Sequence, residues 1–191
     1  MGEVRNRISK THTTLVNRKS DICEVFQLNI NGINPKVPKQ KLKLKALGEI
    51  VNQSEYEIPF FILTETHLKD YIFDAEVEIQ NYTTIRADRK TRKCGGVAIY
   101  SHKSFCLEDN ETFSNKYCEL ALAYNRENDT IIAAIYRPQD ASTENFIECL
   151  DKIKIYKEKY NTATVLIFGD LNLKFIEWTR EVISTPKDIK V

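Results

Sequence analysis

Seven polar residues follow four apolar runs of this 191-residue sequence, at points where a chain could place groups that do chemistry. The runs lie in "VFQLNING", "FFILTET", "AAIYRPQ" and "TVLIFGDLN". Functional sites of layered α/β proteins gather where strand ends meet loops, so we expect these residues to form one cluster. The residues of this cluster are Asn29, Asn31, Glu65, Tyr136, Arg137, Asp170 and Asn172.

The two carboxylates of this set suit phosphate chemistry on a hard cation. Mg²⁺ takes oxygen ligands, commonly one or two carboxylates together with water and substrate phosphate. Glu65 is the candidate metal ligand, and Asp170 could orient or deprotonate a water for in-line attack on phosphorus. A structural interpretation stays open, because Glu65 could begin a helix in "TETHL" and "GD" is a common turn. We interpret His12, His67 and His102 as surface residues, since no second ligand stands at a fixed spacing from any of them.

The other five residues could supply hydrogen bonds to phosphate. Asn29, Asn172 and Tyr136 could donate to the non-bridging oxygens as charge builds up in the transition state. Arg137 could pair with a backbone phosphate through its fork of donors, and Asn31 lies at the same strand end as Asn29. The alternative is that the asparagines form a turn before a glycine and that "YRP" only ends a strand. The order and spacing of the four motifs together favour the functional interpretation.

Short apolar runs and two amphipathic segments indicate the elements that must position these residues. A continuous apolar run is typical of a strand covered on both faces, and apolar residues at helical spacing indicate a helix. The order strand, helix, several strands, helix, strand is typical of an α/β layer protein with helices outside its sheets. Residues 74–82 are ambiguous. The expected strands cover residues 22–30, 58–66, 82–89, 95–102, 117–125, 130–138 and 163–172, and the expected helices cover 41–54 and 142–161.

Composition and charge describe an ordinary globular domain. Hydrophobic residues make up 42% of the chain and charged residues 29%. Lys and Arg total 28 against 27 Asp and Glu, and the formal net charge of +1 gives no argument for nucleic acid. Basic residues gather in "KVPKQKLKLK" and in residues 1–20, which we expect to be a flexible basic leader. We expect one domain over residues 21–191.

The cysteines and the amino-terminal residues indicate a location. Five cysteines without a CxxC pair argue against a disulfide framework and a zinc site, and they favour a reducing compartment. The sequence begins without the apolar region of a secretory signal, and it has no run of about 18 apolar residues that could cross a bilayer. We therefore expect a nuclear or cytoplasmic protein that is neither secreted nor held in a membrane.

Five motifs taken together resemble one family. "LNING", "LTETHL", "CGGVAIY", "AIYRPQ" and "FGDLN" are similar to motifs of the endonuclease/exonuclease/phosphatase superfamily. They resemble most closely the endonuclease domain of non-LTR (LINE-type) retrotransposons, in the chicken-repeat and jockey-like branch. The resemblance covers about residues 22–180. It implies a four-layer α/β sandwich, in which two mostly antiparallel sheets pack face to face and helices flank them.

The resemblance also implies an activity. Members of this family nick DNA with Mg²⁺ or Mn²⁺ and leave a 3′-hydroxyl that primes reverse transcription. The implied partners are therefore DNA and a reverse transcriptase domain of the parent element. Matched by motif, Glu65 is the metal-binding glutamate, and Asn31 and Arg137 stand where the family varies. The catalytic residues matched by motif are Asn29, Tyr136, Asp170 and Asn172.

One family motif has no counterpart in the sequence. The family pattern continues with further strands, an aspartate and a Ser-Asp-His motif whose histidine is central to the chemistry. The 191 residues contain no Ser-Asp-His. The resemblance therefore implies a sandwich that is incomplete at the carboxyl end and a truncated domain that is inactive as it stands, so whether this chain is an enzyme is left open. The alternatives are a non-catalytic remnant that binds nucleic acid or a protein partner, and another phosphodiesterase or phosphatase of the superfamily.

Overall fold

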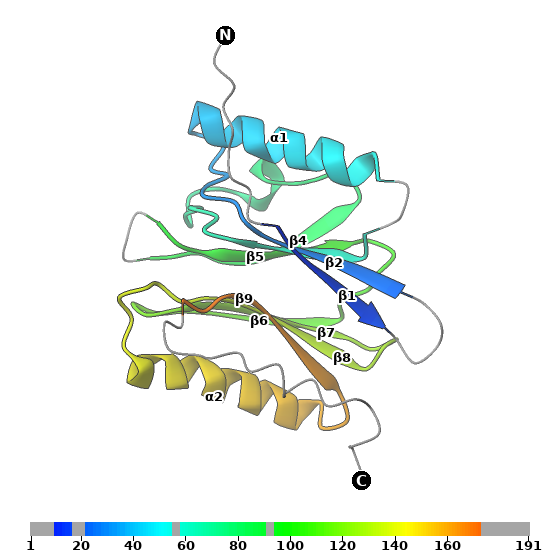
Figure 1. Ribbon diagram of the computed structural model, residues 1–191, viewed down its shortest axis with the longest axis vertical. Coiled ribbons are helices and arrows are strands. Elements are labelled where there is room, and N and C mark those ends of the chain that lie inside the picture. The colour runs from blue at the N-terminus through cyan, green and yellow to red at the C-terminus, as the bar shows by residue number, and fades with distance from the viewer. Residues whose placement is uncertain (1–9, 17–21, 55–57, 91–93, 173–191) are drawn as a thin grey trace.

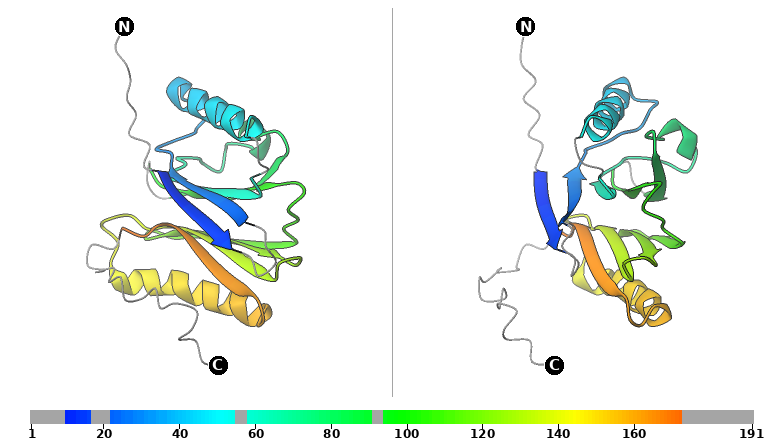
Figure 2. Two further views of the ribbon diagram at one scale, coloured as in Figure 1. Left: turned by 45° about the vertical axis from the view of Figure 1, so that its right-hand side comes forward. Right: turned by 90° about the vertical axis from the view of Figure 1, so that its right-hand side faces the viewer.

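Two β-sheets packed face to face, each with a long helix on its outer side, make up the described part of the chain (Figures 1 and 2). The computed structural model describes residues 10–16, 22–54, 58–90 and 94–172, with the backbone alone for 10–16, 22–24 and 143–145. The layers follow the order helix, sheet, sheet, helix, which confirms the predicted α/β sandwich. Among the described residues, no helix is both long enough and apolar enough to cross a membrane.

The first sheet has the strand order β1-β2-β3-β5-β4. β2 and β3 are parallel because helix α1 (Pro38–Asn52) carries the chain back between them, and the other neighbours are antiparallel. A proline stands in the first turn of α1, where its missing N–H breaks no helical hydrogen bond. The strands are β1 (Lys10–Val16), β2 (Ile22–Asn29), β3 (Phe60–Thr64), β4 (Tyr82–Ala87) and β5 (Val97–His102).

The second sheet repeats this plan with the strand order β6-β7-β8-β9. β8 and β9 are parallel and joined by helix α2 (Thr143–Lys159), whereas β6, β7 and β8 are antiparallel neighbours. Each sheet therefore contains one parallel pair with a helical crossover. The strands are β6 (Asp109–Ser114), β7 (Glu119–Asn125), β8 (Thr130–Tyr136) and β9 (Thr164–Asp170).

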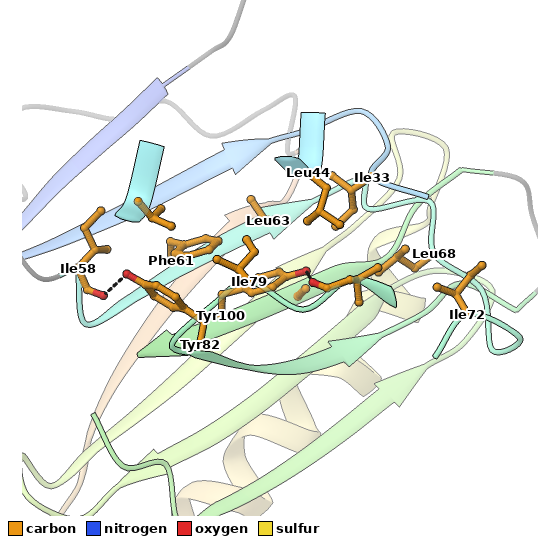
Figure 3. Packing of buried hydrophobic residues seen from close by; sticks show 13 residues of the cluster. Ile33, Leu44, Ile58, Phe61, Leu63, Leu68, Ile72, Ile79, Tyr82 and Tyr100 are labelled. Atoms are coloured by element: carbon orange, nitrogen blue, oxygen red, sulfur yellow. Dashed lines mark hydrogen bonds between the residues drawn. The ribbon is translucent and has the colours of Figure 1, made fainter. Parts of the chain in front are cut away.

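β3 lies in the middle of the first sheet and is buried on both faces, as its continuous apolar run predicts. Phe60 and Ile62 belong to the core between the sheets, whereas Phe61 and Leu63 belong to the core under α1. The four side chains are at most 2% exposed, and burial of each contributes about 1.5–3 kcal/mol. Phe61 stacks on Tyr100 with the ring centroids 4.9 Å apart (Figure 3). This packing fixes the strand that leads into the "ETH" motif.

Strand β7 turns small side chains toward the first sheet and large side chains toward α2. Ala121, Ala123 and Ala134 lie in the core between the sheets, where they face the larger residues of the first sheet. Leu120 and Leu122, on the other face of β7, pack in the core under α2. Large side chains of one sheet against alanines of the other allow close packing of the two sheets.

The structure differs from the sequence prediction in three segments. Residues 10–16, expected to be part of a flexible leader, form strand β1 and pair with β2; their "THTTLV" sequence is rich in β-branched residues, which favour strands. The other leader residues lie outside the described part. Strand β6 was not expected, because an edge strand exposes its residues and its "DNETFS" sequence is polar. The ambiguous residues 74–82 contain a short 3₁₀ helix, η1 (Asp74–Glu76).

Candidate active site

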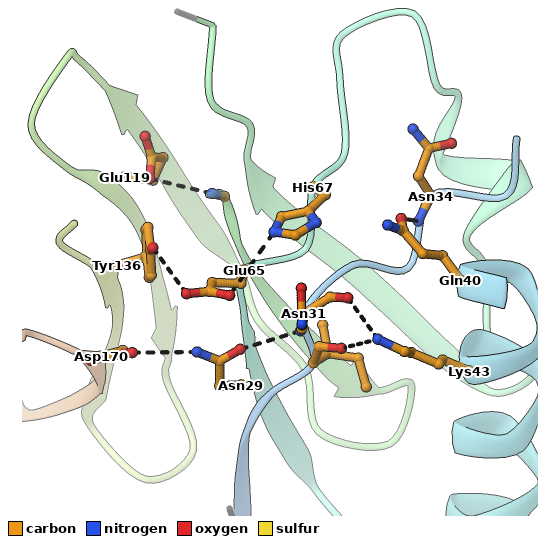
Figure 4. A network of polar contacts seen from close by, with 12 residues as sticks. Asn29, Asn31, Asn34, Gln40, Lys43, Glu65, His67, Glu119, Tyr136 and Asp170 are labelled. Atoms are coloured by element: carbon orange, nitrogen blue, oxygen red, sulfur yellow. Dashed lines mark hydrogen bonds and ion pairs between the residues drawn. The ribbon is translucent and has the colours of Figure 1, made fainter. Parts of the chain in front are cut away.

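The parallel pairs of the two sheets end at the same end of the sandwich. In the first sheet Asn29 lies opposite Thr64, one residue before Glu65. In the second sheet Tyr136 lies opposite Asp170. The side chains of four predicted residues from these strand ends point toward one another between the sheets (Figure 4). The structure thus brings Asn29, Glu65, Tyr136 and Asp170 together.

Two hydrogen bonds connect these four side chains, and each bond crosses from one sheet to the other. The Tyr136 hydroxyl donates to Glu65 Oε1 at 3.0 Å. The Asn29 amide nitrogen donates to Asp170 Oδ2 at 3.4 Å, a longer and weaker contact. Each carboxylate is therefore held by a neutral donor from the opposite sheet.

Tyr136 serves as a donor because its hydroxyl keeps its proton. Burial raises the pKa of Tyr136 well above its ordinary value, and the nearby Glu65 carboxylate raises it further. The hydroxyl is then protonated at every pH at which the protein would work. Sequence analysis assigned this hydroxyl to phosphate, whereas the structure directs it to Glu65.

Four residues of the site have left-handed backbone conformations. The φ angles are 46° at Asn31, 54° at Glu65, 55° at His67 and 45° at Asn172. Such angles are uncommon outside glycine and asparagine, and they cluster at functional sites. The loop after β3 is held in place by backbone bonds, because Gly32 N–H donates to Glu65 O at 2.7 Å and His67 N–H to a glycine carbonyl at 2.9 Å.

The chain turns in the same way after β2 and after β9. Asn29 Oδ1 accepts a bond of 3.2 Å from Asn31 N–H, and Asp170 Oδ1 accepts one of 3.3 Å from Asn172 N–H. In both turns a side-chain oxygen caps the amide two residues later. The Asn172 side chain donates to Arg137 O at 2.7 Å, which ties the second turn to the end of β8.

Arg137 lies beneath the second turn and is only 6% exposed. Its guanidinium donates to Leu171 O at 3.2 Å, to Asn172 O at 3.1 Å and to Ala141 O. It also lies over the Phe146 ring, 5.9 Å from the centroid. These contacts hold the loop after β9 in place. The phosphate contact proposed from the sequence stays a prediction, and this burial disfavours it.

A buried ion pair that sequence analysis missed contacts the site through the Tyr136 ring. Arg89 Nε and Nη2 donate to the two carboxylate oxygens of Glu119 at 2.5 and 2.9 Å, and the two residues are 2% and 0% exposed. The Arg89 guanidinium lies 5.5 Å from the centroid of the Tyr136 ring. Burial raises the pKa of Glu119, and the arginine opposes that shift. The sequence signal was a glutamate inside the apolar run "YCELALAY".

The two glycines of "CGGVAIY", Gly95 and Gly96, leave room for the ion pair of Arg89 and Glu119 and for the loop after β3. Gly96 has a φ of 91°, and a Cβ there would lie 2.4 Å from Thr66 Oγ1. Its N–H donates to Glu119 Oε2 at 3.3 Å. A larger residue at this position would have to displace the Thr66 side chain, next to Glu65, and would be strained at this φ.

A reciprocal amide contact joins the two sheets beside the site, where β2 and β9 lie next to each other (Figure 2). Gln27 Nε2 donates to Gly169 O at 2.7 Å, and Gly169 N–H donates back to Gln27 Oε1 at 2.9 Å. Gly169 has a φ of 140°, and a Cβ there would lie 1.8 Å from Ile135 O. Only glycine fits directly before Asp170. Sequence analysis did not single out Gln27.

His67 is not the surface residue that the sequence suggested. Its side chain is 12% exposed, and Nε2 lies 4.0 Å from Glu65 Oε2. Burial lowers the pKa of His67, so the ring is neutral at neutral pH. His102 binds Ser104 Oγ at 2.8 Å at the opposite end of β5, and the side chain of His12 lies outside the described part.

The residues around Glu65 fit a water-rich cation site. Tyr136 binds Oε1, and Oε2 faces His67 (Figure 4). The Glu65 side chain is 26% exposed, so solvent reaches it. The described residues contain no group of three or more His, Cys, Asp and Glu side chains that could hold a metal. One carboxylate completed by water and phosphate is a donor set that Mg²⁺ accepts.

Comparisons with known proteins identify the fold. No family model and no curated protein matches the chain. Among solved structures, the human Nocturnin catalytic domain with bound sulfate matches with a TM-score of 0.56 and 13% identity over 87% of this chain and 68% of that chain. An AP endonuclease from Archaeoglobus fulgidus matches with a TM-score of 0.54 and 17% identity over 79% of this chain and 58% of that chain.

A third similar structure is TDP2 from C. elegans, with a TM-score of 0.52 and 20% identity over 78% of this chain. The match spans 48% of that chain, so this protein corresponds to about half of its length. These structures belong to the endonuclease/exonuclease/phosphatase superfamily. At such identities the likeness establishes the fold alone. The described sandwich has the endonuclease/exonuclease/phosphatase fold.

Proposed function

We propose that this chain carries the cation-binding and water-positioning half of a DNA-nicking site of the LINE-type retrotransposon endonucleases. The observation that supports this best is the pair of bonds across the sheets, Tyr136 to Glu65 and Asn29 to Asp170. They hold two carboxylates at one end of a nuclease-type fold, each with a defined orientation. The five sequence motifs point to the same family.

The proposed roles follow from the contacts. Glu65 binds the divalent cation, which neutralises charge on the phosphate when it is bound. Tyr136 fixes the Glu65 carboxylate through Oε1. Asp170 orients a water for in-line attack and accepts its proton, while Asn29 fixes the Asp170 carboxylate through a hydrogen bond to Oδ2. Asn172 donates one amide hydrogen to Arg137 O, and its second amide hydrogen binds a phosphate oxygen in this proposal.

DNA is the proposed substrate, and a reverse transcriptase of the parent element the proposed partner. An AP endonuclease is among the similar structures, and the sequence resemblance is to enzymes that nick DNA. Mg²⁺ is the proposed cation, with Mn²⁺ as the alternative, and a nuclear or cytoplasmic location follows from the substrate and the sequence.

The proposed half-site lacks one part of the family pattern. No Ser-Asp-His motif occurs in the 191 residues, and His67 is the histidine that the described part places at the site. We therefore expect the chain alone not to nick DNA. A non-catalytic role in binding nucleic acid is the second candidate, and this missing motif is what favours it.

Plasmid nicking tests both candidates. The chain would be compared with the same chain extended by the carboxyl-terminal segment of a complete LINE-type endonuclease, each with and without Glu65→Gln. The expected result is nicking only by the extended chain with Mg²⁺, lost in the variant. Nicking by the unextended chain would contradict the half-site proposal. An extended chain that folds and binds Mg²⁺ without nicking would favour the binding role.

A further inference from the structure

His67 places an imidazole nitrogen beside the proposed cation ligand and leaves it unused. The side chain is 12% exposed. Nε2 is buried and has no hydrogen-bond partner among the described residues. A buried polar atom without a partner costs free energy, and in native proteins such atoms commonly mark a missing water, an ion or a functional role.

The backbone holds this ring in place. His67 has a φ of 55°, a conformation that disfavours most side chains. Two bonds to the glycine pair fix it there, from His67 N–H to Gly95 O at 2.9 Å and from Thr66 N–H to Gly96 O at 3.3 Å. The ring consequently points toward Glu65 (Figure 4). A strained backbone that orients a side chain is typical of a functional position.

The distance to Glu65 suits two ligands of one ion. Nε2 lies 4.0 Å from Glu65 Oε2, which is too long for a hydrogen bond. Two donors bound to one cation at about 2.1 Å each lie between about 3 and about 4.2 Å apart. Oε2 is also the available oxygen, because the Tyr136 hydroxyl binds Oε1.

We propose that His67 Nε2 is a nitrogen ligand of the divalent cation that Glu65 binds, and that it sets the metal preference of the site. This inference rests on the cation site of the proposed function. Carboxylate and water oxygens suit Mg²⁺, whereas an imidazole nitrogen favours transition metals over Mg²⁺. The imidazole therefore shifts the preference of the site toward Mn²⁺, relative to the same site with oxygen ligands alone.

Mn²⁺ itself is the probe. Pulsed electron paramagnetic resonance of the wild-type chain with one equivalent of Mn²⁺ is expected to show hyperfine coupling to an imidazole nitrogen. Binding of Mn²⁺ and Mg²⁺ would also be measured by calorimetry. The wild-type spectrum needs no variant that might misfold, and an absence of nitrogen coupling in Mn²⁺-loaded protein overturns the proposal.

Two histidine variants locate the ligand. His67→Asn keeps a residue that tolerates positive φ, and its amide is too short to replace Nε2. It is expected to lose the nitrogen coupling and at least about tenfold in Mn²⁺ affinity, with Mg²⁺ affinity changed less than about twofold. His102→Asn removes a histidine at the opposite end of β5 and is expected to change nothing. Coupling that persists in His67→Asn, or equal losses for both cations, overturns the inference.

Glu65→Gln separates this inference from the proposed function. Loss of both cations in Glu65→Gln supports the proposed site, and the His67 variant then decides the ligand question alone. If Glu65→Gln binds both cations as the wild type does, the proposed cation site is wrong and the role of His67 is wrong with it.

Discussion

The turn after β2 and the turn after β9 have the same local geometry in two different sheets. In each, a side-chain oxygen accepts the N–H two residues later, at 3.2 and 3.3 Å, and the accepting turn ends in an asparagine with a φ of 46° or 45°. The first residue differs, because the β2 turn begins with Asn29 and the β9 turn with Asp170. A neutral amide thus faces a carboxylate across the sheets.

That single difference gives the two turns complementary roles. Asn29 still has N–H donors after its oxygen has capped the turn, and one of them reaches Asp170 Oδ2 at 3.4 Å. Two aspartates here would repel each other, and two asparagines would provide no base. The comparison teaches that the turn supplies the geometry and the residue type supplies the chemistry.

The supports of the two turns differ as well. Lys43 reaches from α1 to Ile30 O at 2.8 Å and Asn31 O at 2.6 Å, partly in solvent. The β9 turn rests on the buried guanidinium of Arg137. The residue before the turn is Leu28 in β2 but Gly169 in β9, where no side chain fits. The β9 turn is therefore the more constrained of the two.

Asp170→Asn makes the two turns chemically alike and should have the largest effect. Nicking by the extended chain is expected to fall at least about 10³-fold, because the amide cannot accept a proton from water. The turn itself should survive, since asparagine retains the capping oxygen. Steady-state nicking measures the activity, and urea denaturation measures the stability that shows whether the turn survives. Retention of more than a tenth of the activity would contradict the role of Asp170.

Gly169→Ala tests the tighter packing of the β9 side. The added Cβ would meet Ile135 O at 1.8 Å in a backbone with a φ of 140°. We expect a loss of more than about 3 kcal/mol in the free energy of unfolding, measured by urea denaturation.

Gly48→Ala, within α1, is the matched control, because its added Cβ would make only an ordinary contact of 3.8 Å with Ile79 Cγ2. That change should be neutral or stabilise the protein by up to about 1 kcal/mol. Similar losses of unfolding free energy in Gly169→Ala and Gly48→Ala would contradict the tight packing that we infer at Gly169.

Comparison of Arg137→Met with Lys43→Met tests how strongly each side chain stabilises its turn, Arg137 the turn after β9 and Lys43 the turn after β2. Removing the guanidinium takes a buried donor away from Leu171 O, Asn172 O and Ala141 O, and we expect a cost of about 2–4 kcal/mol. Removing the partly exposed ammonium should cost less than about 1 kcal/mol. Thermal and urea denaturation of the two variants side by side give the difference, and equal losses would mean that the turns are equally supported.

Asn29→Asp places two carboxylates face to face, and its expected effect is smaller than those of Asp170→Asn, Gly169→Ala and Arg137→Met. The pKa of one of them should rise, because like charges at this distance disfavour ionisation. The folded state is then penalised only where both groups ionise, so stability relative to the wild type should fall as pH rises from about 4 to about 7, by about 1–2 kcal/mol. A pH-independent difference would show that the two side chains do not interact.

The strand ends could be predicted from the sequence because each polar motif follows an apolar run. Asn29, Glu65, Tyr136 and Asp170 were found in this way, and the buried strands and both helices followed from periodicity. β6 and β1 escaped the prediction since edge strands need no continuous apolar run.

The remaining parts of the site depend on contacts between segments far apart in the chain. The burial of His67 results from the loop after β3 meeting the glycine pair, and no local pattern encodes it. The bond between Arg89 and Glu119 joins residues 30 positions apart. The positive φ of Glu65 likewise arises from tertiary packing, because glutamate has no intrinsic preference for it.

The two hydrogen bonds across the sheets form only when the sheets are correctly aligned, so the geometry of the site depends on that alignment. Each joins a residue of the first sheet to one of the second, so a slip of one sheet by a single residue, about 3.3 Å, would separate both pairs at once. Since neither sheet holds both carboxylates, the two hydrogen bonds link the halves of the sandwich and resist shear between them.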